Sequence, residues 1–370
     1  MKKAYKNIMA VLIAVSILTG CSAAKTTGET KISVEVTPEV TTTTETTETT
    51  EPEETTAETK APKKESHYEF KTHVSSDLFN EIMGEKKKEA YYNLVDAVLA
   101  HKKEFKCADQ ETYDWMIFQY PYYCFPVLSD YLLPNGGSFD PATGTGTYAF
   151  KVSDEEFYQK LDEFEVMVTG ILNEALEDDY DDFEKALALY QYVTTHFEYD
   201  YEALDYSVED ITAYRAFNAG KGICQEISTV YSYLLMQAGV DAATVSGNRE
   251  YDGEGHQWSI VRVYGKYYQV DPTYGLGTTD LTYFLMTDDK REEEDSYTKS
   301  EWVVANNYAK YKPGMNEDDY VPPYLCSDDS YSELWGKYPL SFDTETKILN
   351  YEDYCTWEPG TFDYGKLSKE

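Results

Sequence analysis

The sequence predicts an α+β fold in which helices precede one buried helix and a small antiparallel sheet. From residue 76 to about residue 238, apolar residues recur at spacings of three and four, the period of an α-helix. From residue 242 the pattern changes to short runs rich in Val, Ile, Tyr and Trp, separated by Gly or Asp, which are typical of strands. Helices and strands that are segregated in this way indicate an α+β arrangement.

The first part of the folded region, residues 66–180, is expected to be helical. Its first helical pattern covers about 76–105, and Gly84 can divide it into two helices. A second pattern covers 110–132 and is interrupted by two prolines, which end or kink helices. The segment 134–147 is rich in Pro, Gly, Thr and Asn and is predicted to be a loop.

Three further helices are expected before the strands. Residues 153–156 read Ser-Asp-Glu-Glu, which resembles a capping box at the start of a helix. An apolar stripe from Phe183 to Val193 predicts the next helix. A short helix from Cys224 to Ala238 then follows Gly222 and ends before Gly239.

The strands of the sheet are predicted at 242–248, 256–264 and 267–272. Tyr264 and Gly265 are expected to form a two-residue hairpin turn. We place the core of the fold at 181–290. Residues 291–370 are acidic and rich in Tyr with few periodic runs, so loops and short elements are expected there.

The first 20 residues have the pattern of a bacterial lipoprotein signal peptide. Basic residues precede an apolar run at 8–18, which is too short to span a membrane core of ~30 Å. The run ends in Leu-Thr-Gly-Cys, which resembles a lipobox in which Cys21 is lipidated. The alternative is an ordinary secretory signal with a chance cysteine. We expect an exported protein, anchored to the outer face of the cell membrane through the lipid on Cys21.

Residues 21–65 are expected to form a disordered tether after the lipidated cysteine. Residues 26–60 contain 15 Thr and nine Glu and no aromatic residue, so they cannot bury enough apolar surface to offset the entropy of ordering. The whole chain has 32 Lys and Arg against 68 Asp and Glu, a net charge of −36. This charge argues against a nucleic-acid partner, which needs a cationic surface.

Cysteine usage indicates a free thiol. Besides the lipobox cysteine the chain has five cysteines, and an odd number in an exported protein suggests that one is unpaired. Cys107 could pair with Cys124 and Cys326 with Cys355, which would leave Cys224 alone. Neither a Cys/His cluster with zinc spacing nor an EF-hand calcium loop is present in the sequence, so no metal or cofactor is expected.

Three residues are candidates for catalysis. Cys224 opens a helix after two glycines, where the helix N-terminus can stabilise a thiolate and later an oxyanion. If the hairpin turn is correct, Trp258 opposes Asp271, and His256 lies diagonally from Asp271 on the same face. Asp271 could then orient the imidazole in a Cys–His–Asp triad. Taken singly, each residue also has an ordinary structural explanation, as a buried thiol, a structural histidine or a turn-forming aspartate.

Gln225, Trp258 and Tyr214 are further candidates for contacts with the substrate or the oxyanion. Trp258 could line the acyl-binding cleft or pack in the core against the helix. Tyr214 lies ten residues before Cys224 and could donate to an oxyanion. The other four histidines lie outside any motif, so solvated or capping roles are expected for them.

The stretch from Asp210 to Gly275 resembles the transglutaminase-like core of many bacterial exported proteins. The matching motifs are Lys-Gly-Ile-Cys-Gln-Glu at 221–226, Tyr-Leu-Leu-Met-Gln-Ala-Gly-Val at 233–240, Val-Ser-Gly at 245–247, His-Gln-Trp-Ser-Ile-Val at 256–261 and Gly-Lys-Tyr-Tyr-Gln-Val-Asp-Pro-Thr-Tyr at 265–274. The resemblance implies a papain-like cysteine-catalysis fold, with Cys224 as nucleophile, His256 as base and Asp271 as orienting carboxylate.

The sequence departs from the family pattern beside the proposed nucleophile and base. Gln257 and Ser259 stand where the family often has Ala and Asn, and both leave the triad intact. Glu226 stands where Gly is common, two residues after the nucleophile. Its carboxylate could compete with the thiolate for the helix dipole, or it could point to solvent.

The resemblance implies an enzyme that acts on amide bonds of proteins or peptides through an acyl-thioester. Hydrolysis by a cysteine protease or amidase is slightly favoured over crosslinking by a transglutaminase. The alternative is a non-catalytic surface module that binds a protein or glycan with the same fold. A redox lipoprotein is a weaker third hypothesis, because no cysteine lies close to Cys224 in the sequence.

Overall fold

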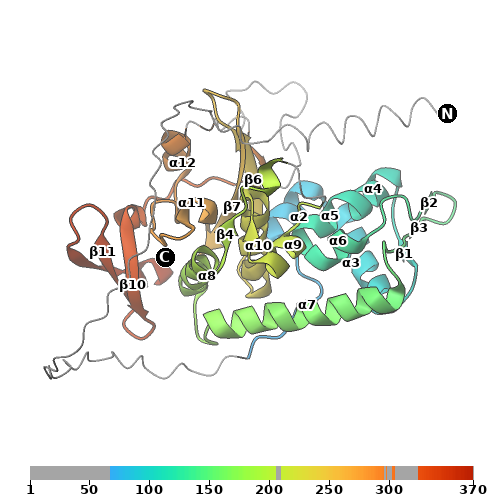
Figure 1. Cartoon of the computed structure of the whole chain (residues 1–370), viewed down its shortest axis with the longest axis horizontal. Helices are drawn as coiled ribbons and strands as arrows, with labels where there is room; N and C mark the ends of the chain where they lie inside the picture. Colours follow the sequence, from blue (N-terminus) through green and yellow to red (C-terminus); the bar gives the residue numbers. More distant parts are fainter. Residues whose placement is uncertain (1–66, 206–209, 296, 298–301, 305–323, 370) are drawn as a thin grey trace, which may run out of the picture. The chain divides into compact units, whose positions relative to one another are not determined.

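The structure, a computed structural model, describes residues 67–205, 210–295, 297, 302–304 and 324–369 (Figure 1). The predicted signal peptide (1–20), Cys21 and the tether (21–65) lie outside the described residues. Among the helices of the described part, none is long and apolar enough to cross a membrane.

The helices predicted before residue 180 form in the expected order. They are α2 (Asp77–Met83), α3 (Glu85–Leu99), α4 (Gln110–Phe118), α5 (Tyr120–Cys124), α6 (Pro126–Tyr131) and α7 (Asp154–Ala175). Gly84 separates α2 from α3 as predicted. Pro121 and Pro126 lie in the first turns of α5 and α6, where a helix does not need their missing N–H group. The Ser153 hydroxyl caps α7 by accepting a hydrogen bond from the Glu156 N–H.

The loop prediction for residues 134–147 was wrong in part. The segment contains β2 (Phe139–Asp140) and β3 (Thr145–Thr147), which form a hairpin, and β3 also pairs with β1 (Glu104–Lys106). Strands of two or three residues are too short to show an alternating pattern, so only their turn residues were visible in the sequence.

The helix α10 (Cys224–Gln237), which begins with the predicted nucleophile, lies at the centre of the core (Figure 1). Its main neighbours are α8 (Asp182–His196), α9 (Ala213–Ala219), β6 (Ala242–Asn248) and β7 (Gly255–Val263). Every residue of α10 except Gln225 is buried. Contacts with other elements therefore surround α10 almost completely and fix its first turn in place.

The main sheet is antiparallel and has the strand order β8-β7-β6-β9. The strands β8 (Lys266–Val270) and β9 (Val303–Val304) lie at its edges. The predicted hairpin turn is confirmed: Tyr264 and Gly265 have φ angles of 48° and 82°, as a two-residue turn between twisted strands requires. The register is also confirmed, because Val263 pairs with Lys266 and Ser259 pairs with Val270.

Beyond β8 the chain turns into the short helix α11 (Pro272–Gly275). Residues 291–370 were expected to form loops and short elements, but they contain more regular structure than that. They contain most of α12 (Asp288–Asp295) and a second antiparallel sheet of β10 (Lys337–Asp343), β11 (Ile348–Asp353) and β12 (Pro359–Asp363). Few residues of this sheet are buried, so the strands carry little apolar alternation.

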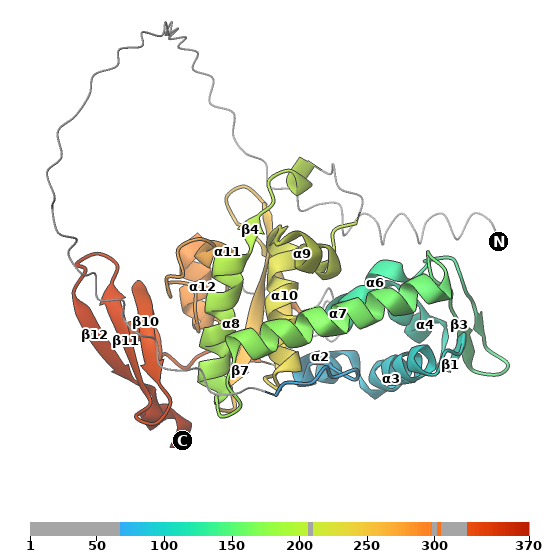
Figure 2. The same ribbon diagram turned by 60° about the horizontal axis from the view of Figure 1, so that its bottom comes forward.

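The remaining elements are short. They are the parallel pair β4 (Glu198–Tyr199) and β5 (Lys221–Gly222), and the 3₁₀ helices η1 (Ala203–Asp205), η4 (Ser332–Leu334) and η5 (Tyr364–Lys369). Figure 2 shows the second sheet beside α8, at the end of the described chain.

A buried carboxylate joins α8 to this second sheet. Glu184 is fully buried and accepts hydrogen bonds from Lys347 Nζ at 2.8 Å and Tyr364 Oη at 2.7 Å. The Asp181 N–H donates to its other oxygen at 2.8 Å. Phe183 packs on the ring of Tyr364 with 4.6 Å between ring centroids. Because a buried charge is tolerated only with partners, Glu184 fixes where the second sheet attaches.

We expect Lys347→Met to lower the free energy of unfolding by about 2 kcal/mol, because Glu184 would stay buried with one charged partner fewer. The control Lys366→Met removes only an exposed ion pair with Asp363 and should change stability by less than about 0.5 kcal/mol. Urea unfolding followed by tryptophan fluorescence measures both variants. Equal, small losses in the two variants would contradict the role given to Glu184.

Candidate active site

The three residues predicted as a triad lie together at one end of α10. Cys224 is the first residue of α10, His256 is the second residue of β7, and Asp271 follows β8 and caps α11. All three are buried, with exposed fractions of 8%, 8% and 0%. His256 Nε2 lies 2.6 Å from Asp271 Oδ2, so the expected diagonal pairing across the hairpin produces a direct hydrogen bond.

The same imidazole reaches the Cys224 thiol. Because Nε2 faces Asp271, Nδ1 is the ring nitrogen that remains for the sulfur, and the two side chains are close enough to interact electrostatically. Burial disfavours the imidazolium, but the interactions with Asp271 and Cys224 outweigh it and raise the pKa of His256 to about 9. A histidine that is protonated at neutral pH can hold a neighbouring thiol as the thiolate.

Asp271 is kept ionised although it is fully buried. Burial alone would raise the pKa of its carboxyl, but His256 and the Arg291 guanidinium more than offset this and hold that pKa below its ordinary value. Its second oxygen, Oδ1, accepts a hydrogen bond from the Thr273 N–H at 3.1 Å. The carboxylate is thus fixed on both oxygens, which is the arrangement that orients an imidazole.

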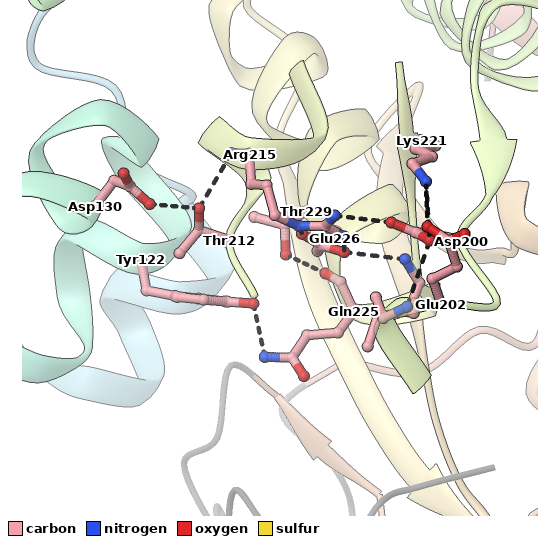
Figure 3. A network of polar contacts seen from close by, with 12 residues as sticks. Tyr122, Asp130, Asp200, Glu202, Thr212, Arg215, Lys221, Gln225, Glu226 and Thr229 are labelled. Carbon is pink, nitrogen blue, oxygen red and sulfur yellow. Dashed lines mark hydrogen bonds and ion pairs between the residues drawn. The ribbon is translucent and has the colours of Figure 1, made fainter. Parts of the chain in front are cut away.

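Of the two alternatives for Glu226, the one in which it points to solvent is wrong, because its carboxylate is buried at the N-terminus of α10. Figure 3 shows its fully buried carboxylate against Arg215, whose Nε and Nη2 lie 2.8 and 2.5 Å from the two oxygens. The carboxylate also accepts from the Ile223 N–H at 3.0 Å, and Arg215 Nη1 reaches Asp200 at 2.8 Å. Its charge is therefore balanced by the guanidinium, and it holds the turn that leads into α10.

Gly222 is required for this arrangement. A Cβ atom at Gly222 would lie 2.9 Å from Glu226 Cβ and 3.2 Å from Ala216 Cβ. A larger residue at position 222 would displace the Glu226 side chain from its position beneath the first turn of α10.

Gln225 is the one partly exposed residue of α10. Its Nε2 donates to Tyr122 Oη at 2.7 Å, so a side chain from α5 lies against the residue that follows the thiol (Figure 3). The sequence did not single out Tyr122, because it lies about a hundred residues before Cys224 and belongs to no motif.

Gln257 links β7, the strand that carries His256, to α10, the helix that carries Cys224. Its Nε2 lies 3.0 Å from the Gln225 carbonyl oxygen and 2.9 Å from Ser228 Oγ. The departure from the family's Ala at this position thus adds a polar link between β7 and the first turn of α10. The separation of Cys224 from His256 is fixed in part by this link.

The structure places Trp258 in the core and not in a cleft. Its side chain is fully buried, and its Nε1 donates to Gln269 Oε1 at 2.8 Å. Tyr214 lies on α9 and packs on Tyr131 and Phe164, beside a surface cavity of about 450 Å³. These contacts give no support to the predicted role of Tyr214 as an oxyanion donor.

Two residues beside the triad were missed in the sequence. Arg291 is fully buried, with Nη2 3.2 Å from Asp271 Oδ2, and the Tyr297 ring lies 5.8 Å from the His256 ring. Arg291 stands among acidic residues in Asp-Asp-Lys-Arg-Glu-Glu-Glu-Asp, which is the composition of an exposed helix. The sequence therefore gave no signal that this side chain is buried.

Neither of the two disulfide pairings forms. All five cysteines of the described part are free thiols. Cys107 and Cys124 are buried in the helical region, where the Cys107 thiol lies near a backbone carbonyl oxygen. Cys326 is buried, whereas Cys355 is exposed in the turn after β11, so the two sit in different environments. Within the described ranges, no group of three or more His, Cys, Asp or Glu residues could hold a metal ion.

A family model matches the part of the chain that carries the three candidate residues. Residues 170–272 match the model of the Transglutaminase-like superfamily, a range that includes Cys224, His256 and Asp271. This part of the chain is similar to the transglutaminase-like superfamily, and the predicted α+β arrangement is confirmed.

The chain is also similar to two curated proteins and a solved structure. It is 26% identical over 225 residues to kyphoscoliosis peptidase from Mus musculus, covering 53% of this chain and 32% of the relative. It is 25% identical over 146 residues to kyphoscoliosis peptidase from Homo sapiens, covering 34% and 22%. A crystal structure of a TGase is 18% identical with a TM-score of 0.29, covering 51% of this chain and 48% of that chain. The chain therefore spans a third or less of the curated relatives.

The raised pKa of His256 predicts how stability depends on pH. The unfolded imidazole has a pKa of about 6.5, so the stabilisation should be complete below that pH and lost as pH rises through about 9. We expect the free energy of unfolding of the wild type to fall between pH 6.5 and 9 by on the order of 3 kcal/mol more than that of His256→Gln. Urea unfolding at several pH values measures this. Parallel pH curves for the two proteins would contradict the buried ion pair.

Removing Arg215 tests the support beneath the thiol. We expect Arg215→Met to lower the free energy of unfolding by about 3–5 kcal/mol, because Glu226 and Asp200 would be left as buried carboxylates without their shared guanidinium. Lys160→Met is the control, since it removes only a surface pair with Glu163. Thermal and urea unfolding give the comparison. A loss no larger than that of the control would show that Arg215 is not needed.

Proposed function

We propose that this chain is a cysteine enzyme that acts on amide bonds of proteins or peptides through an acyl-thioester. The observation that carries the proposal is the buried contact of one imidazole with both a thiol and a carboxylate, at the N-terminus of a helix. A nucleophile, a base and an oriented third group within hydrogen-bond reach are the signature of nucleophilic catalysis. The match to the transglutaminase-like superfamily supports the same chemistry.

The proposed reaction has two halves. In the first, the Cys224 thiolate attacks the amide carbonyl, and the N–H groups of the first turn of α10 face the oxyanion that forms. The His256 imidazolium gives its Nδ1 proton to the leaving amine, and Asp271 holds the ring in place. The C–N bond breaks as the thioester remains on the sulfur.

In the second half, the neutral imidazole takes a proton from the incoming nucleophile. Water yields a carboxylic acid and regenerates the thiolate–imidazolium pair, whereas an amine yields a new amide. We favour hydrolysis slightly, and the similarity to proteins named peptidases supports that choice. The substrate class we propose is a protein or peptide, and no nucleic acid is proposed as a partner because of the net charge of −36.

The proposed location is the outer face of the cell membrane of a bacterium. The signal-like segment 1–20 and the Leu-Thr-Gly-Cys motif support lipidation at Cys21. The Thr- and Glu-rich residues 21–65 would then let the folded part stand away from the membrane. The sequence pattern is the support for this location.

An activated acyl donor tests the proposal without knowledge of the peptide substrate. We expect p-nitrophenyl acetate to acetylate Cys224, with a burst of about one equivalent of p-nitrophenolate and an adduct located by peptide mass spectrometry. The burst should be lost in Cys224→Ala and fall at least about a hundredfold in rate in His256→Ala.

Cys355→Ser is the matched control, because it removes an exposed thiol that could also react and leaves the triad untouched. Addition of glycinamide then distinguishes hydrolysis of the acyl-enzyme from transfer to an amine, by the ratio of acetate to acetylglycinamide. An unchanged rate in His256→Ala, or no adduct on Cys224, would contradict the proposal and favour the surface binding module.

A further inference from the structure

Arg291 is a buried charge next to the proposed site. It lies on α12, outside the residues that match the superfamily model, and its side chain is fully buried. Taking a guanidinium out of water costs several kcal/mol unless it meets an opposite charge or other compensating contacts. The question is therefore which groups hold Arg291 in this position.

The contacts of Arg291 centre on the carboxylate of the triad. Its Nη2 lies 3.2 Å from Asp271 Oδ2, the same oxygen that lies 2.6 Å from His256 Nε2. The guanidinium lies 4.5 Å from the centroid of the Trp258 ring and 4.6 Å from that of Tyr297. Aromatic faces attract a desolvated cation, so the two rings and the carboxylate together fix the guanidinium.

We propose that Arg291 is a positioning residue of the catalytic site, which acts through Asp271 by holding it as a carboxylate with Oδ2 directed at His256. The inference rests on the proposed function of the triad. It assigns a role to a side chain beyond the transglutaminase-like domain and makes the segment that follows the core part of the active site.

The groups around the pair determine what removal of Arg291 would do. Asp271 faces His256 from β7, Arg291 from α12, the Thr273 N–H from α11 and Tyr190 from α8. Arg291 itself faces Asp271 and the rings of Trp258, Tyr274 and Tyr297. Tyr190 is uncharged at neutral pH, because burial raises its pKa well above the ordinary value. Arg291 and His256 are thus the cations that act on the carboxylate.

Without Arg291, Asp271 should take up a proton at higher pH. The buried carboxylate would then keep only His256 and the Thr273 N–H as the partners named above, and once protonated it would no longer stabilise the imidazolium. The thiolate of Cys224 depends on that imidazolium, so its reactivity should fall at mildly acidic pH. A purely structural role for Arg291 would instead lower the reactivity by the same factor at every pH.

The test is the rate of iodoacetamide alkylation of Cys224 between pH 5 and 8, with the modified residue located by mass spectrometry. In the wild type we expect rates at pH 5.5 and 7.5 that agree within about threefold. In Arg291→Met the rate at pH 5.5 should be lower than at pH 7.5 by about tenfold, the fall that results when about nine-tenths of the Asp271 carboxyl is protonated at pH 5.5. Arg291→Lys keeps the charge and should recover most of the wild-type profile.

A double-mutant cycle shows whether the effect passes through Asp271. In the Asp271→Asn background, Arg291→Met should leave the pH profile unchanged, because no carboxylate remains to be held. Arg262→Met is the matched control, since Arg262 is exposed on β7, and it should behave as the wild type. Removal of one partner of a buried ion pair is destabilising, so thermal unfolding is measured for each variant, and the alkylation rates are compared at a temperature at which all of them are folded.

Two results would overturn the inference. One is a profile of Arg291→Met that is parallel to that of the wild type, with Cys224 still rapidly alkylated near pH 6. The other is a shift that persists in the Asp271→Asn background. A wild-type protein whose Cys224 reacts only above pH 8, irrespective of His256, would instead refute the proposed function itself.

Discussion

The hydrogen bond between His256 and Asp271 is the interaction on which the candidate site depends. It forms at 2.6 Å in a buried position, where a charge-assisted hydrogen bond is strong because water does not screen it. Its geometry follows from the two-residue turn at Tyr264 and Gly265, which fixes the register of β7 and β8. A slip of one residue would place the imidazole on the other face of the sheet. The turn therefore determines whether His256 can reach Asp271.

The same kind of interaction, a buried ion pair between two elements, occurs at three points where other segments meet the core. Each point has a fully buried carboxylate and a cation from another element. The pairs are Asp271 with Arg291, Glu226 with Arg215, and Glu184 with Lys347. In a chain with 68 acidic and 32 basic residues, these basic side chains lie where an uncompensated carboxylate would be most costly. The arrangement connects the segment after the core, the helix α9 and the second sheet to the elements that carry the candidate site.

Much of the fold was predictable because its signals are local. The helical period, the prolines at the starts of α5 and α6, and the turn at Tyr264 and Gly265 each act within a few residues, and the register of β7 and β8 follows from that turn. The closeness of His256 and Asp271 could be inferred in the same way. The strands β1 to β3 were missed because two or three residues show no period.

The rest of the site depends on tertiary contacts that leave no local pattern. Tyr122 reaches Gln225 from a helix far back in the chain, and Arg291 is buried from within an acidic helix that looks exposed. Glu226 was recognised as unusual, but its partner Arg215 could not be assigned without the fold. The two suggested cysteine pairings do not form, because the number of cysteines in a sequence does not show which thiols lie side by side in the fold.

The central proposal is that Cys224 and His256 act as a thiolate–imidazolium pair. The absorbance of a thiolate near 240 nm measures it directly, as the difference between the wild type and Cys224→Ser over a range of pH. The account predicts that this difference is already present at pH 6 to 7 and is lost there in His256→Ala. A difference that develops only near pH 8 to 9, the range of an ordinary thiol, and that does not depend on His256 would contradict it.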